Sequence, residues 1–342
     1  MITSNKSLSV EYPLITMYQD IASLFSVLCA NKEKTMKWIC DHCIQLTVAP
    51  YGIRWNFYDF GTPYNIYSVS YCPFIDFYRL NKMAVNDYFS NFTDFIEYQI
   101  NNGYYIRVHM DQFYLSCSNR YKANHNMHEV FIYGYDRDKK EIMVADFIFG
   151  KPTYFFTTVM YDELNLSFSN SMPQSNDPIW FSDIKMFKYV DYDYKINMDL
   201  LKVSLNDYLN CTDNMLIYKY CFRPENADLH YGLNYYDELA EYCVAGERRL
   251  DRKAFHLLCE HKIIMSMRLE YLKDNNYINA IGYKQVFDKC KKNEIDTLGL
   301  RNMALKYNTT NNEDLLKRMS EKCYELKKQD SEFVSDLISI LK

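Results

Sequence analysis

His128 and Asp146 are the two residues whose types and spacing most directly suggest chemistry. They lie in a stretch where two segments rich in β-branched and aromatic residues flank the polar run Asp136–Lys140, a pattern that predicts a β-hairpin. With the turn centred near Asp138, paired residue numbers sum to about 276, so His128 faces Ile148. Asp146 is then a diagonal neighbour, about 7 Å away between Cα atoms. A carboxylate there can orient an imidazole and stabilise its charged form.

The segments around this hairpin indicate a mixed α+β domain. Asp20–Cys29 is apolar, contains no Gly or Pro and offers Asp20 as an N-cap, which predicts a helix. Gly103–Leu115 alternates with period two, as a strand does, and Lys151–Met160 supplies a third strand. A helix followed by several antiparallel strands is typical of the α+β class.

The rest of the chain divides between short mixed elements and a helical C-terminal third. We expect residues 1–225 to form the α+β domain and 226–342 a helical domain, because the sequence after Asn234 reads as almost wholly helical. The other predicted helices are Glu33–Ile44, Ile75–Phe92, Thr93–Asn102, Tyr161–Leu166, Asp199–Asn210, Tyr235–Lys273, Tyr277–Lys291 and Asn312–Leu341. Further strands are predicted at Gln45–Tyr58 and Met215–Phe222, and loops at Pro63–Pro73 and Ser167–Ser182.

Composition excludes several classes of function. The 342 residues are 48% hydrophobic, enough for a large core and more consistent with two domains than one. The net charge of −5 and the lack of a basic run argue against nucleic acid, and no run of 18 apolar residues predicts a membrane span. Eleven scattered cysteines and a polar start predict free thiols in a reducing cytoplasm. Cys40 and Cys43, spaced C-x-x-C, fit a buried helix face better than a metal or redox site, and we expect no cofactor.

A His–Asp pair is the orienting part of a Cys-His-Asp triad, whose nucleophile lies at a helix N-terminus. The order of a helix, a strand with His and a strand with Asp resembles that of papain-like cysteine peptidase folds. The run H-x-x-x-x-x-G-Y-D at His128–Asp136, followed by I-x-V-x-D at Ile142–Asp146, resembles the butirosin-biosynthesis acyltransferase family over about Tyr12–Tyr220.

This resemblance implies a papain-like fold and a defined reaction. Such enzymes transfer a thioester-bound acyl group from a carrier protein to an amine or diamine, forming an amide in peptide-like antibiotic assembly. The amide-forming step of closthioamide assembly is of this type. A cysteine first takes the acyl group, and the amine then displaces it. The expected partners are therefore an acyl or peptidyl carrier protein and a small amine, and a homodimer is possible.

The nucleophile position departs from the family pattern, because no Cys lies near the start of the first predicted helix. The papain-type run C-W-A-F-S matches the chain at Phe25 and Ser26, which aligns Ala22 with the cysteine. Gln19, three residues earlier, would contribute to an oxyanion hole. Three interpretations remain open: an engineered replacement of Cys by Ala22, a natural pseudoenzyme that binds without catalysis, or another thiol, Cys29 above all, as the nucleophile.

Two more histidines, the acyl acceptor and the basic residues of the helical third each have two interpretations. His125 is either a substrate-binding or an ordinary surface residue, and His109 is either an alternative base or a structural residue. The same triad with water as acceptor would make a peptidase or thioesterase. In the helical third, a basic cluster would meet an acidic carrier protein or would be a solvated helix face. Its members are Arg248, Arg249, Arg252 and Lys253.

Overall fold

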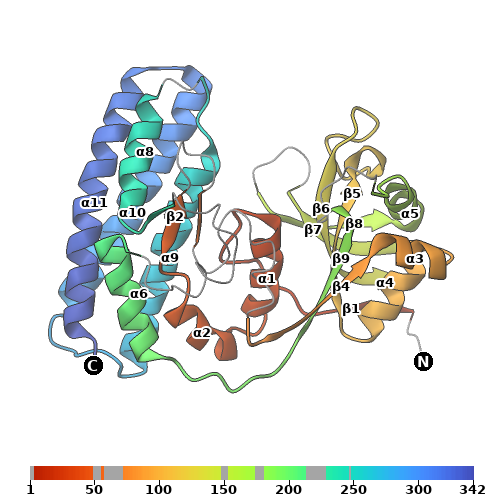
Figure 1. Cartoon of the computed structure of the whole chain (residues 1–342), viewed down its shortest axis with the longest axis horizontal. Coiled ribbons are helices and arrows are strands. Elements are labelled where there is room, and N and C mark those ends of the chain that lie inside the picture. The colour runs from red at the N-terminus through yellow and green to blue at the C-terminus, as the bar shows by residue number, and fades with distance from the viewer. Residues whose placement is uncertain are drawn as a thin grey trace. The chain divides into compact units, whose positions relative to one another are not determined.

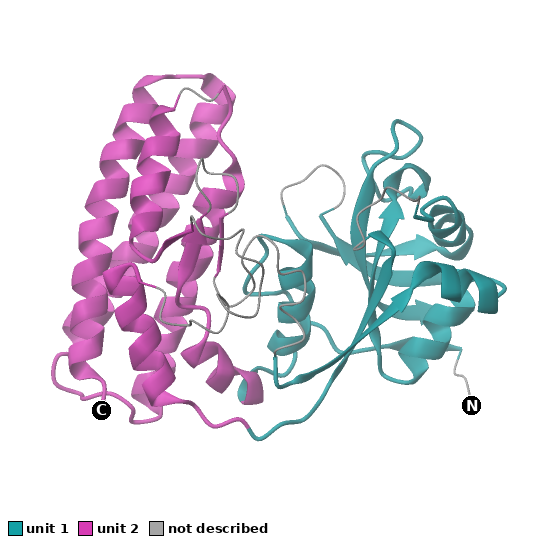
Figure 2. Ribbon diagram, viewed as in Figure 1, with its two compact units in different colours: residues 1–33, 69–193 teal, residues 34–68, 194–342 magenta. Residues whose placement is uncertain are grey.

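The computed structural model describes residues 4–48, 55–57, 72–147, 153–173, 181–212, 229–245 and 248–342. The chain is mixed α+β with antiparallel sheets, and it divides into two compact units (Figure 2). Unit 1 comprises Met1–Glu33 and Val69–Asp193, and unit 2 comprises Lys34–Ser68 and Tyr194–Lys342. The sequence-based division at residue 225 would instead place 34–68 and 194–225 with the first domain.

Unit 1 is built on one antiparallel sheet with strand order β4-β9-β5-β6-β7-β8, and β1 pairs with β6 (Figure 1). The strands are β1 (Asn5–Ser7), β4 (Ile75–Asn81), β5 (Tyr105–Asp111), β6 (Met127–Asp136), β7 (Glu141–Asp146), β8 (Phe155–Met160) and β9 (Asp183–Tyr189). The helices are α1 (Gln19–Cys29), α3 (Lys82–Tyr88), α4 (Phe92–Asn101) and α5 (Tyr161–Ser169), with a 3₁₀ turn at Gln112–Tyr114.

The two faces of this sheet have different chemistry. On one face, Val108, Val130 and Val144 belong to an apolar core that includes residues of α4 and α5. Because successive strand residues point to opposite faces, Arg107 and Glu129 lie on the other face, which contacts α1. Figure 1 shows α1 and the α4–α5 pair on opposite sides of the sheet.

The central hairpin has the expected register at first and then shifts. Phe131 pairs with Ala145 and Ile132 with Val144, as predicted, but a bulge follows and Gly134 pairs with Met143. A Cβ at Gly134 would lie 2.8 Å from the backbone oxygen of Lys6 on β1, so a side chain there would clash. The predicted pairing of His128 with Ile148 lies outside the described residues.

Unit 2 is mainly helical. Its helices are α2 (Lys32–Asp41), which starts at the end of unit 1, α6 (Met198–Asn210), α8 (Asn234–Val244), α9 (Arg252–Asp274), α10 (Tyr283–Thr310) and α11 (Asp314–Ile340). A small sheet has the order β10-β2-β3, formed by β10 (His230–Tyr231), β2 (Leu46–Val48) and β3 (Trp55–Phe57). Buried Arg268 of α9 donates to Cys40 O at 2.7 Å and to His42 O at 2.6 Å, satisfying carbonyls at the end of α2.

The helices predicted at Asp20–Cys29, Thr93–Asn102 and Asp199–Asn210 are confirmed to within one residue at each end. The helix predicted at Ile75–Phe92 is wrong over its first half, where β4 forms, and Asn81 then caps α3 through Met83 N–H. The single run predicted at Tyr235–Lys273 is two helices, and the one predicted at Tyr277–Lys291 extends to Thr310. Strand β9 was not predicted, and the predicted strand Met215–Phe222 lies outside the described residues.

No helix in the described ranges is both long enough and apolar enough to cross a lipid bilayer.

Candidate functional site

His128 and Asp146 form a hydrogen-bonded pair across the central hairpin. The imidazole Nδ1 lies 2.9 Å from each carboxylate oxygen of Asp146. The Asp146 side chain is 1% exposed and that of His128 is 35% exposed, so the carboxylate is buried while the ring still reaches solvent. Nδ1 is committed to Asp146, and Nε2 is therefore the nitrogen available for proton transfer.

The strands position this pair. His128 is the second residue of β6 and Asp146 the last of β7, and the antiparallel pairing brings the two ends together. The Asp146 carboxylate also accepts the Phe147 N–H at 2.6 Å and, more weakly, Gln112 Nε2 at 3.4 Å. Burial of a carboxylate requires such donors, because an unpaired buried charge is costly.

Burial and pairing act in opposite directions on this pair. Burial lowers the pKa of His128, but the hydrogen bond and charge of Asp146 outweigh it, so the pKa of His128 is raised. Burial raises the pKa of Asp146, which the His128 hydrogen bond only partly offsets. The raised pKa makes His128 a stronger base than an ordinary imidazole, which suits a general acid–base group.

Ala22 lies on α1, fully buried, in the fourth helical position. Its N–H donates to Tyr18 O at 2.8 Å, so this amide is already used within the helix. Gln19 begins the helix and donates from Nε2 to Ala145 O at 2.8 Å, which fixes the start of α1 beside the end of β7. The oxyanion role of Gln19 and the nucleophile position of Ala22 stay predictions.

The polar contacts of α1 point to the face of the sheet opposite His128. Arg107 donates to the Ser23 hydroxyl at 3.3 Å, and Arg107 lies on the Glu129 face. By strand alternation His128 shares its face with Val130, which packs toward α4 and α5. The structure therefore joins two of the three proposed triad members by a hydrogen bond and leaves the third on a helix that covers the other face.

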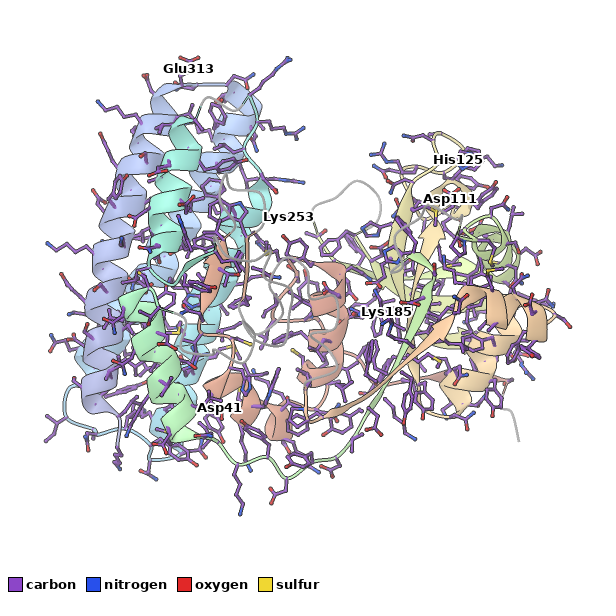
Figure 3. All side chains as sticks on the ribbon, viewed as in Figure 1. Asp41, Asp111, His125, Lys185, Lys253 and Glu313 are labelled. Atoms are coloured by element: carbon purple, nitrogen blue, oxygen red, sulfur yellow. The ribbon has the colours of Figure 1, made fainter. Side chains whose placement is uncertain are left out.

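A buried ionic cluster under α1 was not predicted from the sequence. Lys185 of β9 lies 2.7 Å from Glu129, and the guanidinium of Arg107 lies 3.8 Å from the same carboxylate (Figure 3 labels Lys185). Burial raises the pKa of Glu129, but Arg107 and Lys185 outweigh it and hold that pKa well below its usual range. The half-buried Asp20 also lies within the field of this cluster, and partial removal from solvent raises its pKa. The signal that could have predicted this cluster is the presence of charged residues within otherwise apolar strand segments.

Six buried thiols of the described residues are not poised as nucleophiles. Cys29 is the last residue of α1, about 15 Å along the helix axis from Gln19. Burial raises the pKa of its thiol to about 11. Burial raises the pKa of five more thiols to about 12, those of Cys40, Cys72, Cys117, Cys259 and Cys290. A thiol with such a pKa is almost entirely protonated at neutral pH.

The two alternative histidines differ in environment. His109 is buried on β5, and burial lowers its pKa to about 3, which makes it a weak base. His125 is 67% exposed, and its Nδ1 lies 2.6 Å from Asp111 Oδ2, in a second His–Asp pair. Its ring stacks on Phe113 with centroids 4.4 Å apart. Figure 3 labels Asp111 and His125 beside each other in unit 1.

A scan against protein-family models and a search of curated proteins found no match to this chain. Across the described ranges, no group of three or more His, Cys, Asp and Glu side chains is placed to hold a metal ion, and Cys40 and Cys43 are both buried.

Proposed function

We propose that unit 1 is a papain-like acyltransferase domain that moves an acyl group from a carrier-protein thioester to an amine, with His128 as general base. The observation that carries the proposal is the His128–Asp146 hydrogen bond of 2.9 Å, with the carboxylate buried and the ring partly exposed. Asp146 holds Nδ1 protonated, so Nε2 accepts a proton.

The chemistry is direct aminolysis. Nε2 of His128 takes a proton from the amine as its nitrogen adds to the thioester carbonyl carbon. The carbon–sulfur bond then breaks, and the imidazolium returns the proton to the leaving thiolate, which gives an amide and a free thiol. No acyl-enzyme forms, because Ala22 has no nucleophilic atom and burial, which raises the pKa of Cys29, keeps its thiol protonated.

A carrier-protein donor is supported by the basic cluster at the start of α9. Arg248, Arg249, Arg252 and Lys253 are all exposed, and two of them lie in the first turn of that helix (Lys253 is labelled in Figure 3). Asp251 already caps the start of this helix by accepting the Lys253 N–H, so the support lies in the attraction between four exposed cations and an acidic partner. Charge reversal of Arg248 and Arg249 should raise KM for a carrier-bound thioester and leave KM for a pantetheine thioester unchanged.

A catalytically inert binding protein is the second candidate, favoured by the alanine at position 22 and the raised thiol pKa values. One assay separates these functions. The chain is incubated with an acyl-pantetheine thioester, with and without 1,3-diaminopropane, and amide, free acid and free thiol are measured. Amide that forms only with the diamine and disappears in His128→Ala supports transfer, whereas free acid at equal rates in both arms indicates hydrolysis. No turnover in either arm would leave binding alone.

Intact-mass measurement tests the nucleophile position. The wild-type chain should gain no acyl mass during turnover. Ala22→Cys, with Ala22→Ser as the matched control, should also gain none, because Ala22 is fully buried on a helix that covers the face opposite His128. An acylated wild-type chain would contradict direct transfer.

A further inference from the structure

Gln112 contacts the back of the His128–Asp146 pair. Its Nε2 donates to Asp146 Oδ2, the oxygen that also accepts from His128 Nδ1. Its own Oε1 accepts from Asn126 Nδ2 at 2.7 Å, and its backbone N–H donates to Asn126 O at 2.9 Å. Gln112 is buried, so these bonds hold its carboxamide in place.

The same chain of bonds continues to the second His–Asp pair. The Asn126 N–H donates to Asp111 Oδ1 at 3.1 Å, which also accepts the Phe113 N–H at 3.1 Å. The other oxygen of Asp111 binds His125 Nδ1. Hydrogen bonds therefore connect one imidazole to the other through Asp146, Gln112, Asn126 and Asp111, with the side chain and the backbone N–H of Asn126 making the two middle contacts.

The network allows only one orientation of the Gln112 carboxamide. In the observed orientation its NH₂ group meets the carboxylate of Asp146 and its oxygen meets the NH₂ group of Asn126. A flipped carboxamide would set oxygen against carboxylate and donor against donor, and both contacts repel. The acceptor-only carboxylate of Asp146 therefore selects this orientation, and Asn126 Nδ2 supports it by donating to the Gln112 oxygen.

We propose that Gln112 is a positioning residue for His128, acting through Asp146, with Asn126 supporting the orientation of its carboxamide. This inference rests on the proposed general-base role of His128. By donating to Oδ2, Gln112 limits rotation of the carboxylate, and the carboxylate keeps the proton of the neutral imidazole on Nδ1. Nε2 then stays unprotonated and directed toward the substrate.

The test is ¹⁵N NMR of the imidazole of His128 in the full chain, assigned with His128→Ala, together with amide-forming kinetics. Gln112→Met keeps the length of the side chain and removes its hydrogen bonds. Gln99→Met is the matched control, since Gln99 lies on α4 outside the network. Asn126→Ala is a second variant, which keeps Gln112 and removes only the group that supports its orientation.

We expect Gln112→Met to lower the share of the Nδ1–H tautomer of His128. We also expect it to reduce kcat about tenfold with KM unchanged, because the loss of one hydrogen bond has an effect of this size. Asn126→Ala should lower the tautomer share and kcat by smaller amounts, and Gln99→Met should match the wild type in both measurements. An unchanged tautomer in Gln112→Met and Asn126→Ala, or a wild type without the Nδ1–H tautomer, overturns the inference. A tautomer shift in a chain that forms no amide would leave the inference standing and overturn the proposed function.

Discussion

The two His–Asp pairs of unit 1 have the same Nδ1–carboxylate contact, yet the pKa values of their carboxylates shift in opposite directions. Burial raises the pKa of Asp146, and its partners do not compensate fully. Burial also acts on Asp111, but the hydrogen bonds from His125, Phe113 N–H and Asn126 N–H outweigh it and lower the pKa of Asp111. The difference lies in what surrounds the carboxylate, since the contact itself is shared.

The two imidazoles differ in their exposure to solvent and in the element that carries them. His125 is 67% exposed and lies on the connection before β6, whereas His128 is 35% exposed and lies within the strand. A ring held within a strand against a fully buried carboxylate is preorganised for proton transfer, while an exposed ring on a well-bonded aspartate stabilises a loop. The comparison thus supports the proposal that the His128–Asp146 pair is catalytic and that the His125–Asp111 pair is structural.

Removing each imidazole tests this assignment most strongly. His128→Ala should reduce amide formation by about 10²- to 10⁴-fold, the range of a lost general base. His125→Ala should change the rate by less than about threefold, since its ring is not expected to touch the reacting atoms. The measurement is initial rate with the pantetheine thioester and diamine, with circular dichroism to verify folding. Equal losses in the two variants would remove the distinction.

The carboxylates give the next largest effect, on the pH dependence of the rate. The pKa of His128 is raised, so activity should rise with pH and reach half of its plateau above pH 6.5. Asp146→Asn should move this midpoint down toward 6.5 and lower the plateau. Asp111→Asn should leave the midpoint in place. A midpoint below 6.5 in the wild type would contradict the role of Asp146.

Stability should respond to pH with opposite signs at the two carboxylates. The lowered pKa of Asp111 contributes stability that is present above about pH 3.8 and is lost as the pH falls through its folded value. The raised pKa of Asp146 makes its contribution decrease as the pH rises above about 3.8. Asp111→Asn should cost about 1–3 kcal/mol at pH 7 and less near pH 3. Urea unfolding at several pH values measures the free energy of unfolding of the wild type, Asp111→Asn and Asp146→Asn. The same pH dependence of that free energy in the two variants would contradict the opposite signs.

The smallest expected difference between the two pairs is the rate at which a reagent modifies each imidazole. Diethyl pyrocarbonate should modify His125 a few times faster than His128 at pH 7, because His125 is more exposed and the raised pKa of His128 reduces the share of its reactive neutral form. Buried His261 is the internal control and should not react. Peptide mass spectrometry gives the three rates. Faster modification of His128 would mean that the exposures are reversed in solution.

The sequence was sufficient for the parts of the site that are local in the chain. The hairpin follows from two alternating segments around one polar turn, and its pairing alone brings His128 to Asp146. Their hydrogen bond was therefore predictable, although their catalytic roles stay predictions.

What depends on distant pairing was not predictable. Strand β4 pairs with β9 more than a hundred residues later, with Ile75 opposite Tyr189, and neither segment carries that partner in its own pattern. The ionic cluster of Arg107, Glu129 and Lys185 needs three strands in register, so no single segment shows it. The face of the sheet that α1 covers was likewise beyond local patterns.

The interleaving of the two units has a consequence for synthesis of the chain. The ribosome makes α1 first, then Lys34–Ser68 of unit 2, and only afterwards the strands on which α1 packs. Gln19 meets Ala145 only after more than a hundred further residues have been joined, and unit 2 must wait for its C-terminal helices. Such long-range closure slows folding and leaves apolar helix faces unprotected during translation. No single cut in the chain would yield either unit whole, so the two must be produced together.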